Sequence, residues 1–291
     1  MAPRRGLLNV ARGVFEWAAS VKCAVPADSR LNVLLTVLEG ARRRGTDIVD
    51  RNDPEFPLVQ EASREFLLLD RAMECEQVVR ALGFRGVLKR ALGGGKPLRQ
   101  DETRDSQGRD AMAELNFGVA FANAGATQLE FQNPDLRFRL NGEAVHVAVK
   151  RLKSEGEVEN HIVEARQQIS ELKRPGVIAI DASALVNRSN RHFTEFLSDE
   201  RLNDRTAAIA QRLEDMFTPT LCARGRGPWV IGAIVYVDVI SPLPGQTTLT
   251  CDVKVAIPLL LEGEEWVPLW AEVVRAIRAD SDVSIGPHEP I

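Results

Sequence analysis

The sequence predicts an α/β (α+β) protein in which a mixed sheet flanked by helices follows an N-terminal helical domain. Across residues 5–92, apolar side chains recur at the three- and four-residue spacing of amphipathic helices. From residue 110 onward, short apolar runs suited to strands alternate with helical segments, the order expected of a sheet covered by helices. A glycine run and a polar linker separate the two patterns. We therefore place a helical domain at residues 1–105 and an α/β domain at residues 106–291.

Composition excludes some classes of nucleic-acid binder. The chain has 291 residues, of which 44% are hydrophobic and 27% charged, as in an ordinary globular protein. Its net charge of -4 and its 5% of aromatic residues argue against a protein that coats nucleic acid or stacks single-stranded bases. An enzyme that recruits metal ions is not excluded, because bound cations supply positive charge locally.

The cysteine pattern predicts a cytoplasmic protein. The four cysteines lie far apart and form neither a CxxC pair nor a zinc-ligand spacing. Reduced thiols in the cytoplasm are the simplest interpretation. We expect no membrane contact, because no stretch approaches the roughly 20 apolar residues of a membrane span.

In the second half, each element has its own signal. A helix over 110–125 ends at Gly125, and two alternating segments around Asn141-Gly142 indicate a β-hairpin. A helix is expected next, ended by Pro175, and then a buried strand over 176–185. The remaining segments are expected to be a helix over 192–217, strands over 229–240 and 247–261, and a helix over 267–277.

The predicted hairpin gathers residues suited to phosphodiester hydrolysis. Asp135 opens its first strand after Pro134, and Lys150 lies on its second strand. Ala148 and Lys150 share a face, because side chains alternate along a strand. Mg²⁺ bound by one or two carboxylates activates water and shields phosphate charge, and a lysine beside it can stabilise charge.

This arrangement resembles the PD-(D/E)xK, or restriction-endonuclease-like, superfamily of nucleases. Pro134-Asp135 matches the PD motif and Ala148-Val149-Lys150 matches (D/E)xK, with twelve residues between Asp135 and Ala148. Glu114, on the preceding helix, matches the acid that many members carry there. The helix after the hairpin contains 164–168, EARQQ, which is similar to a glutamine-bearing helix of several members. The resemblance covers residues 110–183.

The resemblance implies a restriction-endonuclease-like fold and a role for each matched residue. Asp135 would bind Mg²⁺ or Mn²⁺, and Glu164 on the next helix is a further candidate ligand. Lys150, Glu114 and Gln167 would serve catalysis, and Arg151 and Lys153 would contact nucleic acid. His146 is not expected to be a ligand, because Mg²⁺ prefers oxygen.

The departure from the pattern is Ala148, whose methyl group cannot bind a metal. Three interpretations compete. In the favoured one, the alanine replaces a natural acid, most simply glutamate, and inactivates the site. In the second, the acid has migrated to Glu164. In the third, the chain is a natural non-catalytic descendant.

We therefore predict a Mg²⁺-dependent nuclease that cleaves nucleic acid, with DNA the expected substrate and phage defence one setting that suits it. The chain shown is expected to be inactive or weak because of Ala148. The N-terminal helices could bind a partner protein or mediate self-association. The alternative is a non-catalytic nuclease-fold module that binds nucleic acid or a protein.

Overall fold

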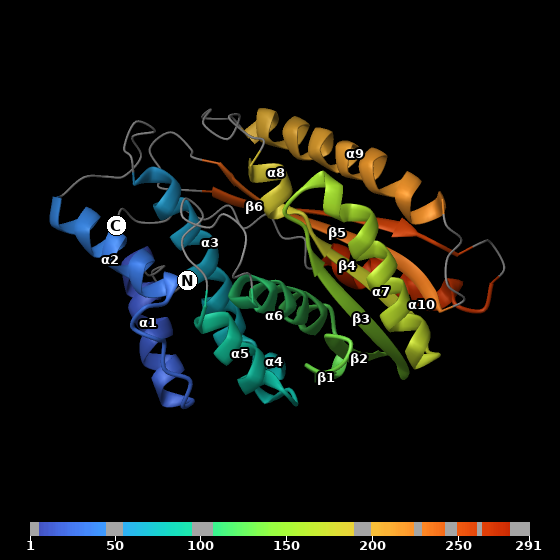
Figure 1. Cartoon of the computed structure of the whole chain (residues 1–291), viewed down its shortest axis with the longest axis horizontal. Coiled ribbons are helices and arrows are strands. Elements are labelled where there is room, and N and C mark those ends of the chain that lie inside the picture. The colour runs from blue at the N-terminus through green and yellow to red at the C-terminus, as the bar shows by residue number, and fades with distance from the viewer. Residues whose placement is uncertain are drawn as a thin grey trace.

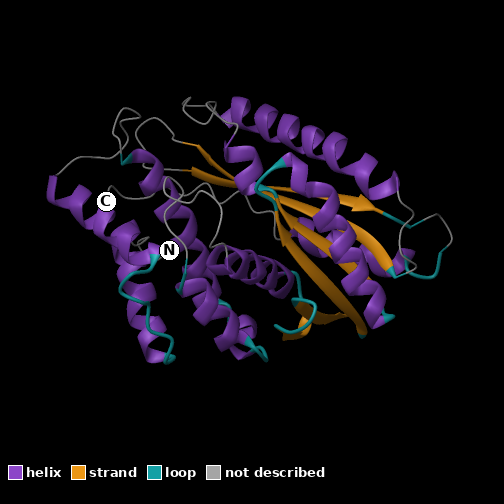
Figure 2. Cartoon of the chain, viewed as in Figure 1, coloured by secondary structure: helices purple, strands orange, loops and turns teal. Residues whose placement is uncertain are grey.

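The computed structural model describes residues 6–44, 55–94, 107–188, 199–223, 229–241, 249–260 and 264–279. Within them, a six-stranded mixed sheet is covered by helices on both faces (Figure 1, Figure 2). The predicted mixed α/β class, with helices at the N-terminus, is confirmed.

The helices before the sheet are α1 to α6: α1 (Leu7–Ser20), α2 (Arg30–Arg44), α3 (Phe56–Glu74), α4 (Glu76–Arg80), α5 (Phe84–Leu92) and α6 (Gln107–Asn123). The strands are β1 (Thr127–Glu130), β2 (Leu136–Leu140), β3 (Glu143–Arg151), β4 (Gly176–Asp181), β5 (Val230–Ser241) and β6 (Leu249–Pro258). Between and after the strands lie a 3-10 turn and four helices: η1 (Glu155–Glu157), α7 (Val158–Leu172), α8 (Ser183–Arg188), α9 (Asp199–Ala223) and α10 (Val267–Ala279).

The strands follow one another across the sheet in chain order. β1, β2 and β3 are antiparallel, β3, β4 and β5 are parallel, and β6 is antiparallel to β5. Helix α7 makes the crossover between β3 and β4, as a parallel connection requires. The predicted hairpin turn is present, with positive φ angles of 49° at Asn141 and 89° at Gly142. Such angles suit asparagine and glycine in a two-residue hairpin loop.

Two hydrophobic clusters lie on opposite faces of the sheet. The first includes Val145 and Val147 of β3 and joins the sheet to α1–α6 and α10. The second includes Ala148 and joins the sheet to α7, α8 and α9. The predicted alternation of β3, with the valines on one face and Ala148 on the other, is therefore confirmed.

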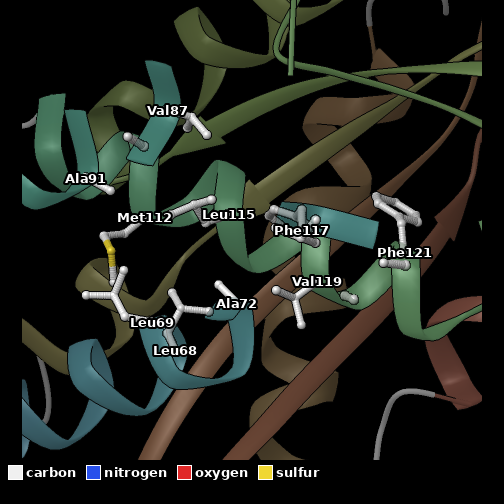
Figure 3. Packing of buried hydrophobic residues seen from close by; sticks show 14 of the residues in the cluster. Leu68, Leu69, Ala72, Val87, Ala91, Met112, Leu115, Phe117, Val119 and Phe121 are labelled. Atoms are coloured by element: carbon white, nitrogen blue, oxygen red, sulfur yellow. The ribbon is translucent and has the colours of Figure 1, made fainter. Parts of the chain in front are cut away.

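Helix α6 is the central contact between the N-terminal helices and the sheet. Phe121 stacks on Phe138 of β2 with ring centroids 4.3 Å apart, and Phe117 meets Tyr236 of β5 edge-on. On its other side, Met112 lies against Leu69 of α3 (Figure 3). One buried cluster thus contains residues from both sides of position 105. The division into two domains stays a prediction.

Strand β1 was not assigned in the sequence analysis, and the strand predicted over 176–185 ends at Asp181, because the chain turns into helix α8 from Ser183. Strand β1 has four residues whose burial does not alternate, and its pairing with β2 has an irregular register. Part of the helix predicted over 192–217 lies outside the described residues; the described helix begins at Asp199. None of the described helices is long and apolar enough to cross a membrane.

Candidate active site

Asp135 ties the start of β2 to the end of β3. Its Oδ2 accepts a hydrogen bond from the backbone amide of Val149 at 2.7 Å. The peptide bond between Asn133 and Pro134 is cis, and the chain enters β2 just after Asp135. The carboxyl group therefore lies beside the segment of β3 that carries Ala148 and Lys150.

The environment of Asp135 disfavours its charge. Burial, with the nearby charge of Glu114, raises the pKa of Asp135 from 3.8 to about 7, although the Val149 amide, Lys150 and Arg90 act in the opposite direction. A raised pKa at such a cluster is common at functional sites, where a bound cation can restore the ionised form. Asp135, Glu114 and Lys150 are thus close enough to influence one another electrostatically.

Glu114 is buried on α6 and paired with Arg90 of α5. The guanidinium donates to both carboxylate oxygens, at 2.9 and 2.8 Å. Burial raises the pKa of Glu114, and the two hydrogen bonds from Arg90 only partly oppose it. The sequence analysis did not single out this role of Arg90, because nothing in the spacing of 24 residues between the partners reveals the pair.

Lys150 extends from β3 toward α7. Its Nζ lies 3.3 Å from Oε2 of Glu164, which is 59% exposed, whereas Lys150 is 13% exposed. His161 Nδ1 approaches the same carboxylate oxygen at 3.6 Å. Glu164, the candidate for a migrated acid, is therefore next to Lys150.

Ala148 is fully buried on the α7 face of β3. It pairs with Ile178 of β4 and belongs to a cluster that includes Ile162 and Ala165 of α7. A longer side chain at this position must displace apolar neighbours or extend along the strand toward Lys150.

Arg151 lies on the opposite face from Lys150. It is buried, and its Nη1 lies 3.8 Å from Oδ1 of Asp110 on α6. Lys153 is half-buried, and its backbone amide donates to Glu157 at 3.2 Å. The nucleic-acid contact predicted for Arg151 would require its side chain to leave this buried position.

Gln167 is exposed on α7, and its amide donates to Glu171 one turn further along at 3.0 Å. Its catalytic role stays a prediction. His146 shares the face of Ala148, and burial lowers the pKa of His146. A neutral imidazole suits a structural role here better than binding of Mg²⁺.

The residues present supply part of a magnesium site. Asp135 and Glu114 offer the hard oxygen ligands that Mg²⁺ prefers, and waters with substrate phosphate usually complete its shell. However, Arg90 engages both oxygens of Glu114. Among the described side chains, no group of three or more histidines, cysteines or acids is arranged to hold a metal ion.

Comparison of the chain with models of known protein families, with curated proteins and with solved structures finds no match.

Proposed function

We propose that the chain is a nuclease of the PD-(D/E)xK type, with Mg²⁺-dependent cleavage of nucleic-acid phosphodiester bonds as its activity and DNA as its substrate. The observation that carries this proposal is the environment of Asp135, where the charges of Glu114 and Lys150 act on a carboxyl with a pKa of about 7. The order of elements supports it, because a glutamate-bearing helix, a hairpin, a helix and a strand follow one another as the resemblance requires.

Each residue has a distinct role in the proposed reaction. Asp135 and Glu114 would hold the metal, which supplies the activated water and shields the phosphate. Lys150 would stabilise charge on the phosphate, and Glu164 holds the lysine in place from α7. With alanine at 148 the site lacks one carboxylate, so weak metal binding and weak activity are expected of this chain.

The proposal is tested by calorimetry with Mg²⁺ and Mn²⁺ and by a DNA cleavage assay. We compare the chain with Ala148→Glu and, as the matched control, with Ala148→Gln, which adds the same bulk without the charge. Tighter metal binding and new cleavage in the glutamate variant alone support the proposal. Equal behaviour of the two variants counts against a missing ligand at 148.

The Glu164→Gln variant tests the interpretation in which the missing acid has migrated to Glu164. If this variant abolishes metal binding by the unmodified chain, Glu164 is a ligand. If metal binding persists and only cleavage falls, Glu164 positions Lys150.

A second candidate is a non-catalytic nuclease-fold module. The observation that favours it is the complete burial of Ala148 in an apolar cluster, because this packing suits a residue selected for the core. Such a module would bind duplex DNA in the presence of EDTA, and Lys150→Ala would weaken that binding.

A further inference from the structure

A small cavity lined by both charged and apolar side chains lies where α3 and α6 cover the ends of the parallel strands. Its volume is about 30 Å³, and its lining includes Arg151 of β3, Asp181 of β4 and Asp238 of β5. In open sheets, ligands bind outside the carboxyl ends of parallel strands. The cavity therefore occupies a position that commonly holds a ligand, on the face of β3 opposite to Lys150.

The lining of the cavity carries more positive than negative groups. Four arginines contribute to it, namely Arg64, Arg71, Arg109 and Arg151. The carboxylates are Glu65, Asp181 and Asp238. Arginine stays protonated in proteins, and one of the four, Arg109, is paired with Glu61, which lies outside the lining.

The carboxylates of the lining are held by other groups. Glu65 accepts from Arg30 at 2.9 Å, and Asp181 accepts from the backbone amide of Ser183 at 2.9 Å. Asp238 lies 3.9 Å from Arg64. These contacts fix the acids around the cavity.

Arg151 is a buried residue of the lining with a donor atom that no hydrogen bond among the described residues satisfies. Its side chain is 3% exposed, and its Nη1 makes no hydrogen bond within the part of the chain that the structure describes. Its Nη1 lies 3.8 Å from Oδ1 of Asp110, too far for a hydrogen bond. A buried donor without an acceptor is costly, so an oxygen atom supplied from outside the chain would stabilise this arginine.

We propose that this cavity binds the carboxylate group of a small molecule through Arg151. A guanidinium can bind a carboxylate with two parallel hydrogen bonds, which suits the planar shape of both groups. A volume of about 30 Å³ is small, so it suits the flat, three-atom carboxylate group better than the tetrahedral, five-atom phosphate. This inference is independent of the proposed nuclease function, because the cavity lining includes neither Lys150 nor the proposed metal ligands Asp135 and Glu114.

The test uses acetate and orthophosphate as probes, on the full chain, with EDTA present and ionic strength held constant. Acetate should raise the thermal midpoint in a saturable manner, with a dissociation constant on the order of millimolar, as expected of so few atoms. Orthophosphate should bind at least tenfold more weakly. The Arg151→Gln variant should lose at least tenfold in acetate affinity, whereas Arg12→Gln, which changes an exposed arginine of α1, should bind as the unmodified chain does.

Several results would overturn the proposal. These are the absence of saturable acetate binding, equal affinity in Arg151→Gln, and orthophosphate binding as tight as that of acetate. Should Arg151→Gln fail to fold, the decision comes from crystals of the unmodified chain grown with acetate. Acetate in contact with Arg151 supports the proposal, and water alone in the cavity contradicts it. Because EDTA removes divalent metal, none of these outcomes depends on the nuclease proposal.

Discussion

Lys150 and Arg151 are neighbours in β3 whose side chains serve opposite faces of the sheet. Lys150 reaches Glu164 on α7 at 3.3 Å, whereas Arg151 approaches Asp110 on α6 at 3.8 Å. Alternation along the strand is the cause. One strand end therefore contributes to two separate polar sites, the proposed nuclease site and the arginine-lined cavity.

The raised pKa of Asp135 makes stability depend on pH. Between about pH 4 and pH 7 the folded chain keeps a proton on this carboxyl that the unfolded chain releases. The free energy of unfolding should therefore fall as pH rises through this range, by on the order of 4 kcal/mol at most. Asp135→Asn removes the titration, so its stability should depend less on pH when urea unfolding is measured from pH 4.5 to pH 8.

The control for this prediction is Asp28→Asn, which changes an exposed aspartate between α1 and α2. Its profile should run parallel to that of the unmodified chain. If the profile of Asp135→Asn is also parallel, the pKa of Asp135 is not raised in the folded chain, and the prediction is wrong.

The sequence predicted the elements around the candidate site because their signals are local. Asn141-Gly142 determines a hairpin turn, and the alternation of β3 determines which residues share the face of Lys150. The pairing of Glu114 with Arg90 was not predictable, because it joins two helices across residues whose spacing carries no pattern. The same is true of Asp181 and Asp238, which only the parallel pairing of β4 and β5 brings to one cavity.

A buried ion pair joins α2 to α3. Arg30 Nη2 lies 2.6 Å from Glu65 Oε2, and both side chains are almost fully buried. Arg30 also donates to the carbonyl oxygens of Gly93 and Gly94. Arg30→Met should reduce the free energy of unfolding by about 3–5 kcal/mol, because it leaves a buried carboxylate without its main partner.

Arg12→Met is the matched control, because Arg12 pairs with Glu39 at 2.9 Å on the surface. Exposed ion pairs contribute only about 0–1 kcal/mol. Both variants are measured by urea unfolding at pH 7. Equal, small losses would mean that the α2–α3 contact depends on apolar packing alone.

Gly232 of β5 leaves no room for a methyl group. A Cβ atom there would overlap the ring of Trp270 on α10. Gly232→Ala should therefore destabilise the fold by about 1–3 kcal/mol, as overpacking does.

Gly86→Ala in α5 is the opposite case, since no heavy atom lies within 4 Å of its added Cβ. That change should stabilise the chain by about 0.5–1 kcal/mol, because alanine is the better helix former. Thermal unfolding of both variants distinguishes steric exclusion at Gly232 from a general effect of added methyl groups.

Arg90→Gln tests whether Glu114 can serve as a metal ligand. The change removes two hydrogen bonds from a carboxylate that is only 7% exposed, so without metal it should destabilise the fold by about 1–3 kcal/mol at pH 7. It should also move the pKa of Glu114 further upward, since Arg90 opposes the effect of burial. A divalent cation competes with Arg90 for the same oxygens, so Mn²⁺ should stabilise this variant more than the unmodified chain.

The measurement for Arg90→Gln is the thermal midpoint at pH 7 with and without Mn²⁺, and Lys89→Gln, an exposed neighbour on α5, serves as the control. A shift with Mn²⁺ that is larger in Arg90→Gln alone places Glu114 among the ligands. Identical shifts in all three proteins would mean that Glu114 is held for structure and that any metal binds elsewhere, because the release of a true ligand must increase the affinity of the folded state.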